Sequence, residues 1–174
     1  GVATNWWQLA TASHTVALKA NGELWTWGGD GRGQLGHGSL EQRNNPQMIG
    51  DDVNWQQQAA GGDHTVVLKA DGSLWAWGSN WTGQLGLGDR VGRASPVQVG
   101  GDTNWRKVVA GGSHTVAIKS DGTLWAWGQN WNGQLGINSR ISSTSPVQVV
   151  GGNDWQDVAA GSGYTIALKS DGSL

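Results

Sequence analysis

The chain has 174 residues, a formal net charge of −2 and a sequence pI of about 6.0. A charge this close to neutral argues against binding to a nucleic-acid backbone, which requires a basic face. The absence of cysteine excludes a disulfide framework and a thiolate nucleophile. No apolar run approaches the ~18 residues of a membrane span, and the first residues do not read as a signal peptide. We therefore expect a soluble segment without membrane contact, and the compartment stays open.

The sequence repeats itself every fifty residues. A fixed period of this length indicates stacked structural units, each too small to bury its own apolar face. Several positions recur in register, including two tryptophans, a Gly-Gln-Leu-Gly run and a histidine slot. These positions are Trp25, Trp75 and Trp125; Trp27, Trp77 and Trp127; Gly33–Gly36, Gly83–Gly86 and Gly133–Gly136; and His14, His64 and His114, with Tyr164 in the fourth slot.

The third unit shows the expected elements in chain order. Trp105–Ala110 is a short apolar run, and His114–Lys119 alternates in the period-two pattern of a strand. Asp121-Gly122 follows, and we expect it to form a type I′ hairpin turn, in which both central residues need positive φ. Leu124–Trp127 is the return strand. Pro146–Val149 is expected as the fourth strand, because proline suits the start or the edge of a strand.

Four short strands per unit and no helical period predict an all-β fold built from propeller blades, each a four-stranded antiparallel sheet. We expect one propeller segment over residues 1–174, with units at about 1–51, 52–101 and 102–151 and a partial unit at 152–174. The paired tryptophans are expected to pack between blades, because two indoles at positions i and i+2 make one flat apolar face. A third indole per unit is expected from Trp6, Trp55, Trp105 and Trp155.

These residues resemble the regulator of chromosome condensation repeat family. The segment from Ala60-Gly61-Gly62-Asp63-His64-Thr65 through Trp75-Ala76-Trp77-Gly78 to Gly83-Gln84-Leu85-Gly86 is similar to the family signature. The signature recurs at 110–136 and, slightly eroded, at 12–36. The resemblance implies a seven-bladed propeller. It does not carry over nucleotide exchange, for which the family uses an inserted wedge, nor chromatin binding, for which it uses basic loops and a basic tail.

No set of residues predicts catalysis, a cofactor or a metal site, so we do not expect an enzyme. Equivalent positions on neighbouring blades lie about 10 Å apart, whereas a metal ligand must approach to ~2.0–2.1 Å. One ion therefore cannot gather His14, His64 and His114, and we expect each to close a turn through a hydrogen bond to backbone. Asp63-His64 and Ser113-His114 lack a recurring third partner for a catalytic set.

Two features are candidates for binding a partner. Trp81 and Trp131 stand in the loops Asn80–Gly83 and Asn130–Gly133, where an indole can stack on a sugar, anchor a protein or cover the edge of a blade. The stretches 37–45, 87–95 and 137–145 differ between units. Loops on a rigid scaffold often carry recognition, and these contain Arg43, Arg90, Arg93 and Arg140.

The fourth unit is expected to be half a blade, which leaves apolar faces and an open strand edge at the two ends of the array. We therefore expect self-association into a larger ring, as a homodimer or another homo-oligomer. The leading functional prediction is a non-catalytic scaffold for protein–protein interaction. The alternatives are a carbohydrate-binding module that uses Trp81 and Trp131, and an engineered or excised propeller fragment without its own activity.

Overall fold

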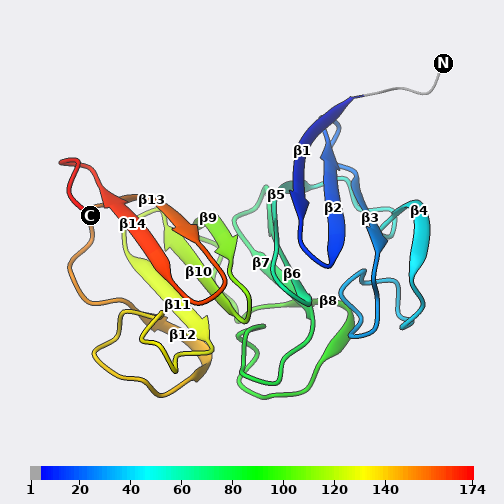
Figure 1. Cartoon of the computed structure of the whole chain (residues 1–174). Coiled ribbons are helices and arrows are strands. Elements are labelled where there is room, and N and C mark those ends of the chain that lie inside the picture. The colour runs from blue at the N-terminus through cyan, green and yellow to red at the C-terminus, as the bar shows by residue number, and fades with distance from the viewer. Residues whose placement is uncertain (1–4) are drawn as a thin grey trace.

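The computed structural model describes residues 5–174, which form four antiparallel sheets arranged side by side in an arc (Figure 1). We refer to the sheets as blades 1 to 4. Blade 1 contains β1 (Trp6–Thr11), β2 (His14–Lys19), β3 (Leu24–Gly28) and β4 (Arg43–Met48), and blade 2 contains β5 (Trp55–Ala60), β6 (His64–Lys69), β7 (Leu74–Gly78) and β8 (Arg93–Gln98). Blade 3 contains β9 (Trp105–Ala110), β10 (His114–Lys119), β11 (Leu124–Gly128) and β12 (Ser143–Gln148), and blade 4 contains β13 (Trp155–Ala160) and β14 (Thr165–Lys169).

In the three complete blades the strands pair in sequence order as a meander. The middle hairpins keep one register, with His14 opposite Gly28, His64 opposite Gly78 and His114 opposite Gly128. The all-β propeller architecture expected from the repeat is therefore confirmed. Among residues 5–174, no helix is long and apolar enough to cross a membrane.

The hairpin turn differs from the expected type I′. Gly72 has φ +79°, but Asp71 does not share a positive φ. The Gly72 N–H donates to the Lys69 carbonyl at 3.0 Å, which makes a type I turn followed by a left-handed glycine. The Asp71 Oδ1 accepts from the Ser73 N–H at 2.9 Å, so the carboxylate stabilises the turn without leaving the right-handed region.

The fourth strands begin earlier than expected. In blade 3, β12 starts at Ser143, and Pro146 lies inside the strand. The register shifts at that point, because Gly128 pairs with Ser143 while Ala126 pairs with Val147. A proline, which has no N–H to donate, is tolerated in such an irregularity on an edge strand. The expectation that proline opens this strand was therefore wrong.

Successive blades pack through the tryptophan of one blade and the Gly-Gln-Leu-Gly loop of the blade before it. Trp77 is fully buried, and its Nε1 donates to the Gln34 carbonyl at 2.9 Å. Trp127 is equally buried against Gly86. Trp55 and Trp105 each contact both indoles of their own blade, with ring centroids 6.0–6.2 Å apart. Trp6 contacts Trp25 and Trp27 in the same way, as expected for the third indole of blade 1.

Candidate interaction surface

Three long loops follow β3, β7 and β11, the third strands of the complete blades. They span 29–42, 79–92 and 129–142. Since the three strands run in equivalent directions, the loops emerge on the same edge of the array, at the bottom of Figure 1. We refer to these three loops together as the loop edge.

A buried asparagine holds the loop in blades 2 and 3. The Asn80 Oδ1 accepts from the Leu85 N–H at 2.9 Å, and its Nδ2 donates to the carbonyls of Asp89 and Val91 at 3.0 and 3.2 Å. Asn130 makes the equivalent bonds to the same positions of its own loop. One side chain therefore ties the start of each loop to its variable part, which fixes the backbone that carries the exposed residues.

Blade 1 has Asp30 where the other blades have asparagine. Its Oδ1 accepts from the Leu35 N–H at 2.9 Å, as in the other loops, but its Oδ2 is buried without a hydrogen-bond partner. Burial raises the pKa of this carboxyl, and the nearby Arg43 opposes that shift. The Asp30 side chain therefore makes one hydrogen bond within its loop, where Asn130 makes three.

Both tryptophans predicted as binding residues are strongly exposed. Trp81 and Trp131 each expose 64% of their surface, so neither covers a blade edge. The guanidinium of Arg32, from the preceding blade, lies 4.4 Å from the centre of the Trp81 ring. That distance is within the range of a cation–π contact, so blades 1 and 2 together build the surroundings of this indole.

The four predicted arginines are placed differently. Arg90 and Arg140 are exposed on the loops of blades 2 and 3, and the Arg90 Nη1 approaches the Trp81 carbonyl at 3.5 Å. Arg93 is half-buried and pairs with Asp89 at 2.6 Å. Arg43 begins β4, and its Nε is buried without a partner. Of the four, Arg90 and Arg140 are therefore the exposed ones, and Arg90 lies beside Trp81.

Sequence reasoning missed the exposed aliphatic side chains of the variable stretches. Leu40, Val91 and Ile141 expose 62%, 63% and 78% of their surface. Each lies near the end of its loop, two or three residues before the fourth strand, and Val91 and Ile141 directly follow Arg90 and Arg140. An apolar residue inside an otherwise polar variable stretch was the available signal, but sequence alone does not distinguish a buried from an exposed aliphatic residue.

The histidine slot is structural, although its partner differs from the expected backbone group. The His64 Nε2 lies 3.0 Å from Thr115 Oγ1 in the next blade. The threonine hydroxyl donates its single hydrogen to the Gln84 carbonyl at 2.7 Å, so it must accept from the histidine. The Nε2 of His64 therefore carries a proton, and its buried Nδ1 has no hydrogen-bond partner. His14 with Thr65 and His114 with Thr165 repeat the contact at 2.7 and 3.0 Å.

Burial determines the protonation of these histidines. Removal from solvent lowers the pKa of His64 to about 3 and the pKa of His14 and of His114 to about 4. Within residues 5–174, no group of three or more His, Cys, Asp or Glu side chains is arranged to hold a metal ion. The histidines contribute contacts between blades, and the loop edge remains the candidate surface.

The repeat can be compared with known protein families and structures. The regulator of chromosome condensation (RCC1) repeat matches residues 21–68, 71–118 and 121–168. The first of these segments joins β3 and β4 of blade 1 to β5 and β6 of blade 2, so the family's repeat straddles two sheets.

Individual relatives agree with this match. Human RCC1 domain-containing protein 1 is 45% identical over 38 residues, which cover 22% of this chain and 10% of that protein. The RCC2 homolog of Xenopus laevis is 40% identical over 38 residues, covering 22% of this chain and 7% of that protein.

Solved structures extend the similarity over almost the whole chain. Human WBSCR16 superimposes with a TM-score of 0.87 at 28% identity, covering 97% of this chain and 45% of that one. Yeast RCC1 (Prp20), solved with Kap60 bound to it, superimposes with a TM-score of 0.81 at 25% identity, covering 94% of this chain and 40% of that one. The chain thus spans less than half of these structures. With three matched repeats and this fold, it belongs to the RCC1 repeat family.

Proposed function

We propose that this propeller segment is a non-catalytic scaffold that binds a protein partner through the loop edge. The observation that carries the proposal is the exposure of Trp81 and Trp131 at 64% each, on loops whose backbone is held by buried asparagines. Tryptophan and arginine dominate the energetic centres of protein interfaces. The loop edge combines both residue types with exposed aliphatic side chains, in a frame that loses little conformational freedom on binding.

A partner is also compatible with the relatives. Yeast RCC1 (Prp20) is described with a protein, Kap60, bound to it. That complex supports the proposal as far as it is an example of a protein bound to a member of this family. The identity of the partner does not transfer, because this chain corresponds to 40% of that one.

The test replaces the loop residues while the blades are kept. Neutral Gly, Ser and Asn sequence grafted into 37–42, 87–92 and 137–142, which stop before the fourth strands, should abolish capture of the partner. Trp81→Ala with Trp131→Ala should weaken binding on the order of tenfold or more, since truncated central indoles cost about 2 kcal/mol or more. Unchanged circular dichroism and an unchanged urea midpoint show that the fold is intact. Capture that survives the graft would refute the assignment of the loops.

The same exposure favours a second candidate, which is stacking of Trp81 and Trp131 on sugar rings. The two readings differ in the ligand class, so a glycan array separates them. Hits that disappear when both tryptophans are replaced by alanine would favour the carbohydrate reading. An array without hits would dismiss it.

We also propose that copies of the chain associate through the outer faces of blades 1 and 4. Leu9 is 65% exposed on blade 1, whereas its equivalent Val108 is 1% exposed between blades. Tyr164 and Ile166 on blade 4 are 62% and 51% exposed, while the equivalent His64 and Val66 are fully buried. Faces of this composition are covered by another blade within the array, and a second copy can provide such a cover.

The native mass in solution tests this self-association. Light scattering at micromolar concentration should report an oligomer that dissociates when Leu9→Lys and Ile166→Lys are combined, because charges on both faces oppose burial. A stable monomer at that concentration would rule the association out.

A further inference from the structure

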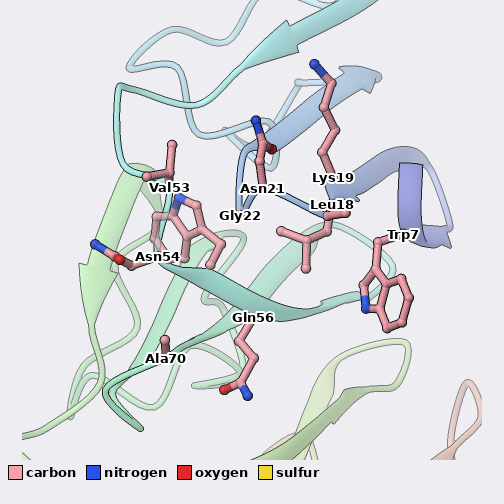
Figure 2. A pocket seen from close by; sticks show the side chains of 11 residues that line it. Trp7, Leu18, Lys19, Asn21, Gly22, Val53, Asn54, Gln56 and Ala70 are labelled. Carbon is pink, nitrogen blue, oxygen red and sulfur yellow. The ribbon is translucent and has the colours of Figure 1, made fainter. Parts of the chain in front are cut away.

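An open cavity of about 470 Å³ lies between blades 1 and 2, on the edge opposite to the loop edge. This edge carries the hairpin turns that join the second and third strands. The residues that line the cavity include Trp7, Lys19, Asn21, Val53, Trp55 and Gln56. Figure 2 shows the Trp7 indole on one side of the opening and Val53 with Asn54 on the other.

The equivalent place between blades 3 and 4 is filled by Arg106. Its guanidinium donates to three main-chain carbonyls, those of Lys119 at 3.2 Å, Trp155 at 2.6 Å and Gln156 at 3.3 Å. One of these carbonyls belongs to the arginine's own blade and two belong to the next blade. The junction of two blades therefore forms a binding site for a planar guanidinium, in which each of the three nitrogens donates to one carbonyl.

The junction between blades 1 and 2 has the same positions with a different central residue. Trp7 takes the place of Arg106, because each is the extra residue at the β-bulge of its first strand. By the repeat, Lys19, Trp55 and Gln56 take the places of the three residues whose carbonyls accept from Arg106, and all three line the cavity. Blade 1 thus has the frame of a guanidinium site without a guanidinium of its own at that position.

Among the described residues that line the cavity, Lys19 is the one cation, and its charge is directed elsewhere. The Lys19 Nζ pairs with Glu23 at 2.7 Å and lies 4.2 Å from the centre of the Trp25 ring. Figure 2 shows its side chain extending away from Trp7 and Gln56. Lys19 therefore leaves the cavity empty. Because its charge is paired with Glu23, it does not strongly repel a second cation that enters the cavity.

From this geometry we infer that the cavity between blades 1 and 2 binds the guanidinium of an arginine side chain presented by a protein or peptide partner. Carbonyls at the positions of Lys19, Trp55 and Gln56 accept its N–H groups as they do for Arg106. Trp7 is 68% exposed, and its indole face provides a cation–π contact to the bound guanidinium in addition to the carbonyls. Lysine is a poorer ligand, because its ammonium cannot fork to separated acceptors. The site is independent of the loop edge.

The probe is the peptide acetyl-Gly-Arg-Gly-amide, and the readout is the Trp7 indole N–H signal in ¹⁵N-correlated NMR spectra of the 174-residue chain. The arginine peptide should shift that signal in a saturable manner. The lysine analogue should bind at least about ten times more weakly than the arginine peptide. The citrulline analogue, which has the same shape as arginine without its charge, should bind more weakly than the lysine analogue. No shift with the arginine peptide, or equal binding of the citrulline peptide, overturns the inference.

Two variants use the chain's own repeat as a control. Trp7→Arg should fill the cavity with the chain's own guanidinium, raise the urea midpoint and abolish binding of the peptide. Trp7→Gln introduces the residue that blades 2 and 4 have at this position, and it should weaken binding without abolishing it. Binding by Trp7→Arg equal to that of the native chain overturns the inference. If Trp7→Arg does not fold, Arg106→Ala decides the question: its lowered midpoint should recover with added arginine peptide and not with the citrulline analogue, and failure to recover overturns the inference.

Discussion

The last glycine of each Gly-Gln-Leu-Gly run has a different physical role in different units. A Cβ at Gly36 would stand 2.6 Å from the Trp77 Nε1, and one at Gly86 would stand 2.7 Å from the Trp127 Nε1. At Gly136 the nearest atom is the Val149 Cγ1, at 3.1 Å. All three glycines have positive φ, between 64° and 81°. Backbone conformation is therefore a shared requirement, and the close approach of an indole is an additional one in the first two units.

Asparagine substitutions separate the two requirements, because asparagine tolerates the left-handed region. Gly36→Asn and Gly86→Asn should lower the free energy of unfolding by about 1–3 kcal/mol more than Gly136→Asn, since only they force an indole out of its place. Gly50→Asn is the matched control, with φ +53° and nothing within 4 Å of its Cβ. Urea unfolding provides the measurement. Equal costs at Gly36 and Gly136 would show that backbone conformation alone selects glycine.

At the scale of the element, each blade is organised around a lysine at the end of its second strand. The Lys69 Nζ lies 4.6 Å from the ring centre of Trp55 and 4.2 Å from that of Trp75. Its charge is balanced by Asp52. Lys119 repeats the arrangement with Trp105 and Trp125, and Asp102 supplies the carboxylate. The strand pattern alone places this lysine on a polar face, and the structure shows that it covers the indoles of the neighbouring strands.

This arrangement explains why the two tryptophans of the third strand are not equivalent. Trp77 and Trp127 are fully buried against the preceding blade. Trp75 and Trp125 are half-buried beneath the lysine, and their Nε1 atoms donate to Ser73 and Thr123 at 3.0 and 2.8 Å. A pattern of period two assigns both indoles to the same face, as observed, but it does not separate the indole that contacts the preceding blade from the one at the rim.

At the scale of the whole molecule, the buried histidines make stability depend on pH. The pKa of His14, His64 and His114 is about 3–4 in the folded chain and about 6.5 in an unfolded one. The unfolded state therefore binds more protons below pH 6.5, and the contribution of these groups to stability is lost as pH falls toward 4. The loss by pH 5 is on the order of 2 kcal/mol per histidine.

The urea midpoint should thus fall steadily from pH 7 to pH 5, before most carboxylates are protonated. The reason is local, because a proton on Nδ1 would be buried without an acceptor. His37→Gln is the control, since the His37 Nε2 lies 3.0 Å from the Thr26 Oγ1 of its own blade and is not one of the histidine–threonine contacts between blades, and it should leave most of the slope unchanged. A flat profile over this range would contradict the assigned burial.

Much of the fold was predictable from the sequence because it depends on local chemistry repeated in register. Alternating residues determine the strands, turn glycines determine the hairpins, and a period of fifty residues determines that like faces stack. The turn type and the start of the fourth strand were predicted wrongly. The turn type depends on an aspartate carboxylate that accepts a hydrogen bond from a backbone N–H of the turn. The start of the fourth strand depends on how the edge strand accommodates a proline.

The surfaces required the tertiary structure. The sequence by itself determined which positions are shared by all units and which vary, and so it pointed to Trp81 and Trp131. Only the packed blades decided that these indoles are exposed, that Arg32 of one blade lies over Trp81 of the next, and that Trp7 lines a cavity whose equivalent holds Arg106. The physical reason is that these contacts join side chains from different units, and a repeat fixes the composition of each unit without fixing which substituted residue meets which neighbour across a junction.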